Sequence, residues 1–473
     1  MSKRFLIFAC VAIAACSVTA KVRLHHLIAD NMVLQSSSDV RLWGWDKPGK
    51  EVKVSVSWNN RTYTTRADKS GAWEVRVLTP AASYTPLSIR FDDGDVTTVS
   101  NVLSGEVWVC AGQSNMEMPV RGFDGCPVEG YNDVVVDARR HSGVRYAKVP
   151  SAMAMKPQKD ANIRWQVISP STVQWTSATG YFFARMLEQT LGVPVGIIEA
   201  NKGGTRVESW LDADNLKKNT DEKLDSASIY SIKTDYYRPL VWGNGTFAPI
   251  VKYTVKGIVY YQGCSNVGYH TDDYARRLDL LVGQWRRSFG LGDIPFYFVE
   301  IAPYWYDNAQ GIEAALLREQ QQKAAASIRN SGLVGNNDGA YSWEMKQIHP
   351  SQKRKVGERL AFQALSKTYG IGGLIYENPS YESMTISGSD IIVKLRNTEH
   401  GIYPLYGIEG FEIAGSDGKF YPAAARYDWK DGIVVTSPKV HAPKAVRYCF
   451  HNFQLGNARN QGGLPLLPFR SDK

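Results

Sequence analysis

A serine that directly follows a buried strand is the first candidate for chemistry in this sequence. Ser114 stands in Gly-Gln-Ser-Asn-Met at 112–116, immediately after the apolar run 107–111. A glycine-containing turn at the end of a strand places such a side chain at the mouth of a sheet, where a serine can act as a nucleophile if a base reaches it. The same residue types also form ordinary turns, so Ser114 is a candidate for catalysis and no more at this point.

Two further loops carry hydrogen-bond donors that could stabilise an oxyanion. Gly203 and Gly204 follow a second buried-strand pattern, and a residue without a side chain lets its backbone N–H approach a ligand closely. Gln262 and Asn266 follow a third such pattern and carry side-chain amides, which are the second usual kind of oxyanion donor. Each loop taken alone is equally well explained as a turn.

A candidate general base stands further along the chain. His349 lies in Ile-His-Pro, just before the helical pattern 352–365. A neutral imidazole can take the proton of a serine hydroxyl and return it to a leaving group, although a lone histidine is often only structural. The spacing of Cys, His, Asp and Glu matches no metal site, so we expect neither a metal nor a cofactor.

These loops need a scaffold that brings strand ends together, and the middle of the chain has the pattern of one. Short apolar runs alternate with helical patterns, which is typical of a parallel sheet with helices on both faces. In such sheets the ligand crevice lies beyond the carboxyl ends of the strands. The predicted strands are 107–111, 192–200, 255–261 and 295–301, and the predicted helices are 180–191, 274–289 and 314–329.

Both ends of the chain have a β pattern instead. Short segments with alternating apolar residues and turns fill 22–100, which is typical of an antiparallel sandwich. The pattern returns after 378, with predicted strands at 390–395, 410–413, 432–436 and 445–450. We therefore predict an N-terminal β-sandwich domain over 21–102, a catalytic α/β domain over 103–377 and a C-terminal β-rich domain over 378–473.

The composition is that of a folded globular protein. Of 473 residues, 44% are hydrophobic and 21% are charged, which excludes disordered, collagen-like and coiled-coil chains. The net charge of +9 is spread along the sequence, with no basic run beyond short pieces such as 353–355, so nucleic acid is not an expected partner. The aromatic share of 11% suits a sugar-binding protein but is equally explained by strand cores.

The first 20 residues have the pattern of a signal peptide. Lys3 and Arg4 precede an apolar stretch that is too short to span a bilayer, and no later run reaches that length. We expect export to the periplasm or the extracellular space, and we favour cleavage before Lys21 over lipoprotein processing at Cys16. The pairing of the four later cysteines cannot be derived from the sequence; they are Cys110, Cys126, Cys264 and Cys449.

The order of the loop motifs resembles a known superfamily. Gly-Gln-Ser-Asn-Met, Gly-Gly-Thr, Gln-Gly-x-Ser-Asn and Ile-His-Pro follow one another as in SGNH hydrolases, and within these the chain resembles the sialate O-acetylesterase family of carbohydrate esterases. The segments 30–35, 285–298 and 463–470 extend the resemblance over nearly the whole chain. It implies an SGNH-type three-layer α/β/α domain with a parallel sheet, flanked by β-rich, sandwich-like segments.

The resemblance also implies roles for the candidate residues. Ser114 would be the nucleophile and His349 the general base, and the N–H groups of Ser114 and Gly204 would hold the oxyanion together with a side-chain amide. For that amide we prefer Asn266 to Gln262. An acetyl-enzyme would form and be hydrolysed by water, with no cofactor.

The sequence departs from the family pattern at two places. The family usually carries an acidic residue just before Ile-His-Pro, near the position of Gln347. Glu344, Asp338 or a backbone carbonyl could orient the imidazole instead, and loss of an orienting acid can lower a rate by several orders of magnitude. Cys264 stands where an acidic residue is common, and a cysteine cannot replace that charge in an ion pair.

The sequence thus predicts a secreted serine esterase that removes O-acetyl groups from a sugar, with sialic acids as the first choice. One alternative is an acetylesterase for plant polysaccharide such as xylan or pectin. Another is a catalytically weakened glycan-binding protein. The position of the acetyl group on the sugar and the oligomeric state stay open.

Overall fold

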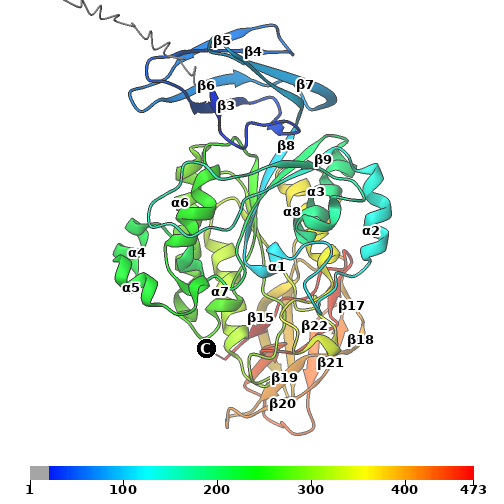
Figure 1. Cartoon of the computed structure of the whole chain (residues 1–473). Helices are drawn as coiled ribbons and strands as arrows, with labels where there is room; N and C mark the ends of the chain where they lie inside the picture. The colour runs from blue at the N-terminus through cyan, green and yellow to red at the C-terminus, as the bar shows by residue number, and fades with distance from the viewer. Residues whose placement is uncertain (1–20, 473) are drawn as a thin grey trace, which may run out of the picture.

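The protein has three regions along its length, a β-rich end, a central α/β part and a second β-rich end (Figure 1). The computed structural model describes residues 21–472. The predicted signal peptide, including Cys16, therefore lies outside the described residues. None of the helices within 21–472 is long and apolar enough to cross a membrane.

The central sheet has the strand order β10-β9-β11-β8-β12-β13-β14. All neighbours in this order are parallel except β10, which runs antiparallel to β9. The four predicted strands are confirmed, and the structure adds β9, β10 and β14. The bounds are β8 Val96–Gly112, β9 Val144–Lys148, β10 Trp165–Val167, β11 Val195–Asn201, β12 Gly257–Tyr261, β13 Phe296–Val299 and β14 Ser331–Val334.

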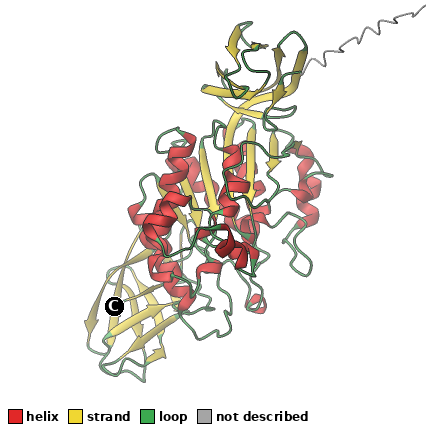
Figure 2. Cartoon of the chain, turned by 60° about the vertical axis from the view of Figure 1, so that its left-hand side comes forward, coloured by secondary structure: helices red, strands yellow, loops and turns green. Residues whose placement is uncertain are grey.

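Both faces of this sheet are buried, which explains why its strands are apolar without alternation. Trp108 and Cys110 of β8 point into one core, which contains side chains of α3 and α8. Val107 and Val109 point into the other, which contains side chains of α6 and α7. In Figure 2 the strands run between groups of helices. The predicted helices are confirmed as α3 Ala178–Leu191, α6 Tyr274–Phe289, α7 Glu313–Ser327 and α8 Lys353–Lys367.

The N-terminal β region joins the central sheet through one strand. The first half of β8 pairs with β2 and β7, and its second half pairs with β11 and β12. A separate sheet, β1-β3-β6, packs against this group, with the rings of Trp73 and Phe91 5.8 Å apart. The bounds are β1 Arg23–Leu24, β2 Val33–Gln35, β3 Asp39–Trp45, β4 Glu51–Val56, β5 Thr62–Arg66, β6 Ala72–Leu78 and β7 Ser83–Asp92.

The C-terminal region is also built from short strands around its own core. Strands occur at each of the four predicted places, in β16, β19, β22 and β23. The bounds are β15 Ser380–Ser387, β16 Asp390–Arg396, β17 Ile402–Tyr403, β18 Tyr406–Ile408, β19 Phe411–Ala414, β20 Phe420–Pro422, β21 Ala424–Asp428, β22 Gly432–Thr436, β23 Ala445–Tyr448, β24 Arg459–Asn460 and β25 Phe469–Arg470. Because β8 passes through position 102, the first predicted domain boundary falls inside a strand, and the division into domains stays a prediction.

Four short α-helices lie in the connections of the central part, besides several single 3-10 turns. They are α1 Ser114–Glu117, α2 Tyr131–Asp137, α4 Ala213–Asn219 and α5 Ser226–Ser231. The cysteines of the described part of the chain are all free thiols: Cys110, Cys126, Cys264 and Cys449.

Candidate active site

Ser114 lies just after the carboxyl end of β8 and is the first residue of α1. The turn before it requires glycine, since Gly112 has φ +143° and a Cβ there would lie 2.2 Å from the carbonyl oxygen of Tyr261. Two hydrogen bonds of Gln113 join this turn to the end of β12. The N–H of Gln113 donates to Tyr261 O (3.0 Å), and its side-chain oxygen accepts from Gly263 N–H (2.7 Å). The half-buried serine is thus held at the edge of a rigid sheet.

The Gly203-Gly204 turn after β11 lies against the serine. A Cβ built on Gly203 would be 3.3 Å from the Cβ of Ser114. The N–H of Gly203 donates to the carboxylate of Glu117 (2.6 Å). By contrast, the N–H groups of Gly204 and Ser114 have no hydrogen-bond partner within residues 21–472. Both are therefore free to donate to a substrate oxygen.

The two amide side chains differ in their capacity to donate. Gln262 is buried, and its Nε2 donates to Thr205 O (3.0 Å) and to Asn266 Oδ1 (2.9 Å), which uses both of its hydrogens. Asn266 is also fully buried: its Nδ2 lies 3.0 and 3.4 Å from the two carboxylate oxygens of Glu208, and its Oδ1 accepts from Val207 N–H and Gln262 Nε2. Gln262 therefore has no hydrogen left to donate, and the assignment of Asn266 as the third donor stays a prediction.

The loop that carries His349 is bonded to the serine turn. Asn115 Nδ2 donates to Ile348 O (3.0 Å), which joins the neighbours of the two candidate residues. The ring of Phe123 packs edge-on against the imidazole, 5.0 Å between centroids. Among residues 21–472 no hydrogen bond joins Ser114 Oγ to the imidazole, and such bonds often tighten only when substrate binds.

The environment of His349 keeps its imidazole neutral. Burial, and then the charge of Lys353, lowers the pKa of His349 to about 4. At neutral pH the ring is therefore unprotonated and can accept the proton of a serine hydroxyl. It differs in this from His141, whose pKa the carboxylates of Glu188 and Asp137 raise against the opposing effect of burial.

The acidic residues considered as orienting partners of His349 are engaged elsewhere. Asp338 makes a two-pronged ion pair with Arg359 (2.7 and 2.9 Å), which lowers the pKa of the carboxyl although burial opposes the shift. Glu344 accepts the backbone N–H groups of Tyr341 and Ser351, both at 2.9 Å. Within the described chain neither carboxylate bonds the imidazole, so Glu344 supports the loop at both ends rather than the ring itself.

Gln347, at the place of the usual acid, contacts only the backbone of the histidine. Its side-chain oxygen accepts the N–H of His349 at 3.3 Å. An amide here can hold the loop but cannot supply the negative charge that stabilises an imidazolium.

One residue that the sequence did not single out, Lys353, connects the serine turn to the helix that follows the His349 loop. Lys353 is fully buried at the start of α8, and its Nζ donates to Asn115 Oδ1 (2.7 Å). Burial lowers the pKa of Lys353 to about 7, with Cys264 and Glu344 opposing the shift. Burial likewise raises the pKa of the Cys264 thiol. The basic run 353–355 was the only signal in the sequence for Lys353, and it reads as ordinary surface charge.

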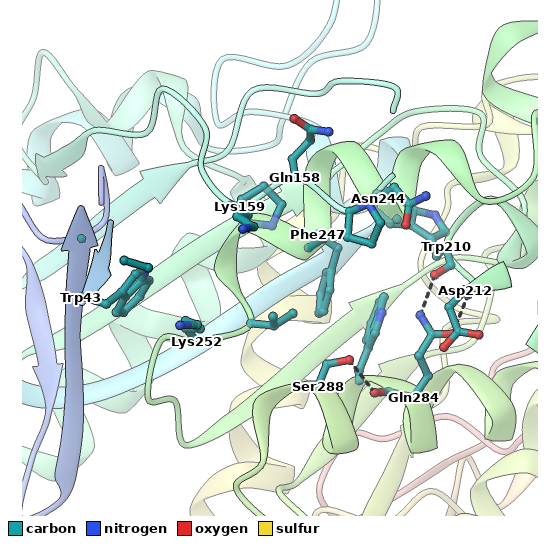
Figure 3. A pocket seen from close by; sticks show the side chains of 18 of the residues that line it. Trp43, Gln158, Lys159, Trp210, Asp212, Asn244, Phe247, Lys252, Gln284 and Ser288 are labelled. Carbon is teal, nitrogen blue, oxygen red and sulfur yellow. Dashed lines mark hydrogen bonds between the residues drawn. The ribbon is translucent and has the colours of Figure 1, made fainter. Parts of the chain in front are cut away.

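A separate cavity lies away from these residues. It has a volume of about 410 Å³ and opens between the N-terminal sheet and α6, with none of the candidate site residues in its wall. Figure 3 shows Trp43 of β3 on one side of it and Gln284 and Ser288 of α6 on the other. The cavity therefore belongs to the joint between the two regions, not to the loops around Ser114.

A serine next to free N–H donors at the carboxyl end of a parallel sheet, on a turn that is hydrogen-bonded to the loop of a neutral imidazole, is an arrangement that suits a hydrolase acting on esters. A family model agrees: the one described as "Carbohydrate esterase, sialic acid-specific acetylesterase" matches residues 104–366. The match covers more than half of the chain. The protein belongs to this family and is an esterase, as the motifs predicted.

Individual relatives agree with this assignment. Human sialate O-acetylesterase is 26% identical over 396 residues, which cover 77% of this chain and 74% of the human protein. The mouse enzyme of the same name is 25% identical over 452 residues, covering 83% and 82%. The crystal structure of a carbohydrate acetylesterase from Xanthomonas citri superposes with a TM-score of 0.85 at 31% identity, over 96% of this chain and 100% of that one.

Proposed function

We propose that this protein is an exported carbohydrate O-acetylesterase that removes acetyl groups from sialic acids, with Ser114 as its nucleophile. The observation that carries the proposal is the position of Ser114, with Gly203 against its Cβ and Asn115 bonded to the loop of His349. The names of the family and of its mammalian relatives support sialic acid as the sugar. The pattern of residues 1–20 supports export.

The first half of the proposed reaction transfers the acetyl group to the enzyme. His349 takes the proton of the Ser114 hydroxyl, and Oγ forms a bond to the acetyl carbonyl carbon, whose oxygen becomes an oxyanion. The N–H groups of Ser114 and Gly204 stabilise this charge, with Asn266 Nδ2 as the proposed third donor. The tetrahedral intermediate then expels the sugar oxygen, which receives the proton from His349.

The second half releases acetate. A water molecule gives a proton to His349 and attacks the acetyl-enzyme, the same donors hold the second oxyanion, and Ser114 leaves with the proton from the imidazole. Since no carboxylate of the described residues bonds His349, the loop contacts of Asn115, Gln347 and Glu344 orient the ring in this proposal. We also assign the central part to the SGNH type of layering, on the helices that pack against both faces of its sheet.

The test is acetate release from O-acetylated N-acetylneuraminic acid, with acetylated xylo-oligosaccharides as the competing substrate class. Ser114→Ala should abolish release, whereas Ser231→Ala, an exposed serine of α5, should not change it. Retention of activity in Ser114→Ala would overturn the assignment of the nucleophile. Release from the xylo-oligosaccharides alone would move the substrate to plant polysaccharide, and sugar binding without any release would favour a glycan-binding protein.

A further inference from the structure

A fixed arginine lies two residues after the oxyanion turn. The guanidinium carbon of Arg206 is 3.9 Å from the ring centroid of Tyr237 and 3.4 Å from that of Tyr269. Its Nε donates to Ser265 O (3.2 Å). Two aromatic faces and one hydrogen bond thus hold a half-buried guanidinium in one orientation, and each cation–π contact is favourable.

This cation has no anionic partner within residues 21–472, where no carboxylate oxygen lies within 4.0 Å of it. Neither Nη1 nor Nη2 makes a hydrogen bond to the described chain, and the nearby acids are engaged. Glu222 accepts from Tyr269 OH (2.8 Å), and Glu208 pairs with Arg277. An oriented guanidinium with two free donor groups is a ready site for an anion.

The arginine is attached to the same elements as the oxyanion donors. The next residue, Val207, donates its N–H to Asn266 Oδ1 (3.1 Å), and Ser265, which accepts from Arg206, precedes Asn266. Tyr236 precedes Tyr237, one of the two rings against Arg206, and packs on Gly204 so closely that a Cβ on Gly204 would lie 2.5 Å from the Tyr236 ring. Arg206 is therefore attached to the two loops that carry the proposed oxyanion donors Gly204 and Asn266.

We propose that Arg206 binds the carboxylate of the substrate and makes the esterase selective for acidic sugars over neutral ones. The planar fork of an arginine matches a carboxylate with two parallel hydrogen bonds, which a neutral sugar cannot form. Tyr237 and Tyr269 already hold the Arg206 side chain in place, so less conformational entropy is lost when the substrate binds. This inference rests on the proposed function, since it names the sugar class that the same site accepts.

The experiment compares Arg206→Gln with the wild type on two substrates that differ only in the anion: O-acetylated N-acetylneuraminic acid and its carboxyl methyl ester. Loss of charge-assisted hydrogen bonds should lower kcat/KM for the free acid by about 10- to 100-fold, mainly through KM. The methyl ester should lose much less. Arg206→Lys keeps the charge without the fork and should lie between the wild type and Arg206→Gln.

Arg238→Gln is the matched control, because this arginine lies in the same region but donates to the carbonyls of Ile232 and Tyr230. It should leave the ratio of kcat/KM for the two substrates as in the wild type. The ratio does not depend on the amount of folded enzyme, so a partly unfolded variant still gives an answer. Equal losses on both substrates, or an equal effect of Arg238→Gln, would overturn the inference alone, whereas absence of acetate release by the wild type would overturn the proposed function.

Discussion

Replacement of Lys353 by methionine should remove a pH-dependent part of the protein's stability. The amine is fully buried beside Asn115, and burial lowers its pKa from 10.5 to about 7 in the folded protein. Between these two values the unfolded chain binds a proton that the folded protein does not. The free energy of unfolding therefore rises with pH through this window, and the buried amine destabilises the folded protein most below pH 7.

The size of the effect follows from the two pKa values. At pH 7 the folded amine is half protonated and the unfolded amine is fully protonated, whereas at pH 9 the folded amine is neutral and the unfolded one is still mostly charged. Each pH unit with a full proton of difference adds about 1.4 kcal/mol. Lys353 should therefore add about 2 kcal/mol to the free energy of unfolding between pH 7 and pH 9.

The assay is urea unfolding of the wild type and of Lys353→Met at pH 7, 8 and 9. Loss of the hydrogen bond to Asn115 lowers the free energy of unfolding of the variant by the same amount at each pH. The titration of Lys353 is therefore read from how the difference in this free energy between wild type and variant changes with pH. Lys217→Met, at an exposed position of α4, controls for the loss of a lysine. A difference between wild type and Lys353→Met that stays constant from pH 7 to pH 9 would refute the reasoning.

Two further predictions concern the catalytic loops. Because the pKa of His349 is about 4, kcat/KM should stay high down to pH 5 and fall as the pH approaches 4. Lys353→Gln removes a nearby positive charge and should move this fall to higher pH. A pH profile of kcat/KM that is the same in Lys353→Gln and the wild type would contradict the effect of Lys353 on the pKa of His349. Gly204→Ala should abolish acetate release, since φ is +79° and the new Cβ would meet Tyr236. Gly192→Ala has a similar φ of +66° with free space around it, so it should lose about 1–3 kcal/mol of stability from the strained φ alone and keep its activity. Equal activities of the two glycine variants would show that the Gly204 turn is not part of the site.

The strands of the central sheet were predictable where their residues form uninterrupted apolar runs, as in 107–111 and 255–261. Strand β9 was not, because Arg145 breaks its pattern. That side chain is buried and donates to the carbonyl of Asn101, a partner that the sequence does not reveal. Strand β14 was missed for a different reason, since Ser331 and Gly332 give half of its four residues no β preference.

The candidate site was predictable at the level of its loops and not of its contacts. Strand ends followed by Gly, Ser and Asn indicated Ser114, Gly204 and Asn266. The preference for Asn266 over Gln262 depends on which amide hydrogens are already used, and the roles of Lys353 and Arg206 depend on partners far away in the chain. Such contacts are set by tertiary packing, which motif spacing does not encode.

The most direct test of the account is to trap the acetyl-enzyme. Wild-type protein mixed with O-acetylated N-acetylneuraminic acid and quenched in acid within its first turnovers should carry one acetyl group on the peptide that contains Ser114, as read by mass spectrometry. The group should be absent from Ser114→Ala treated in the same way. Acetate release by the wild type with the acetyl group on another residue, or by Ser114→Ala at an undiminished rate, would contradict the central claim.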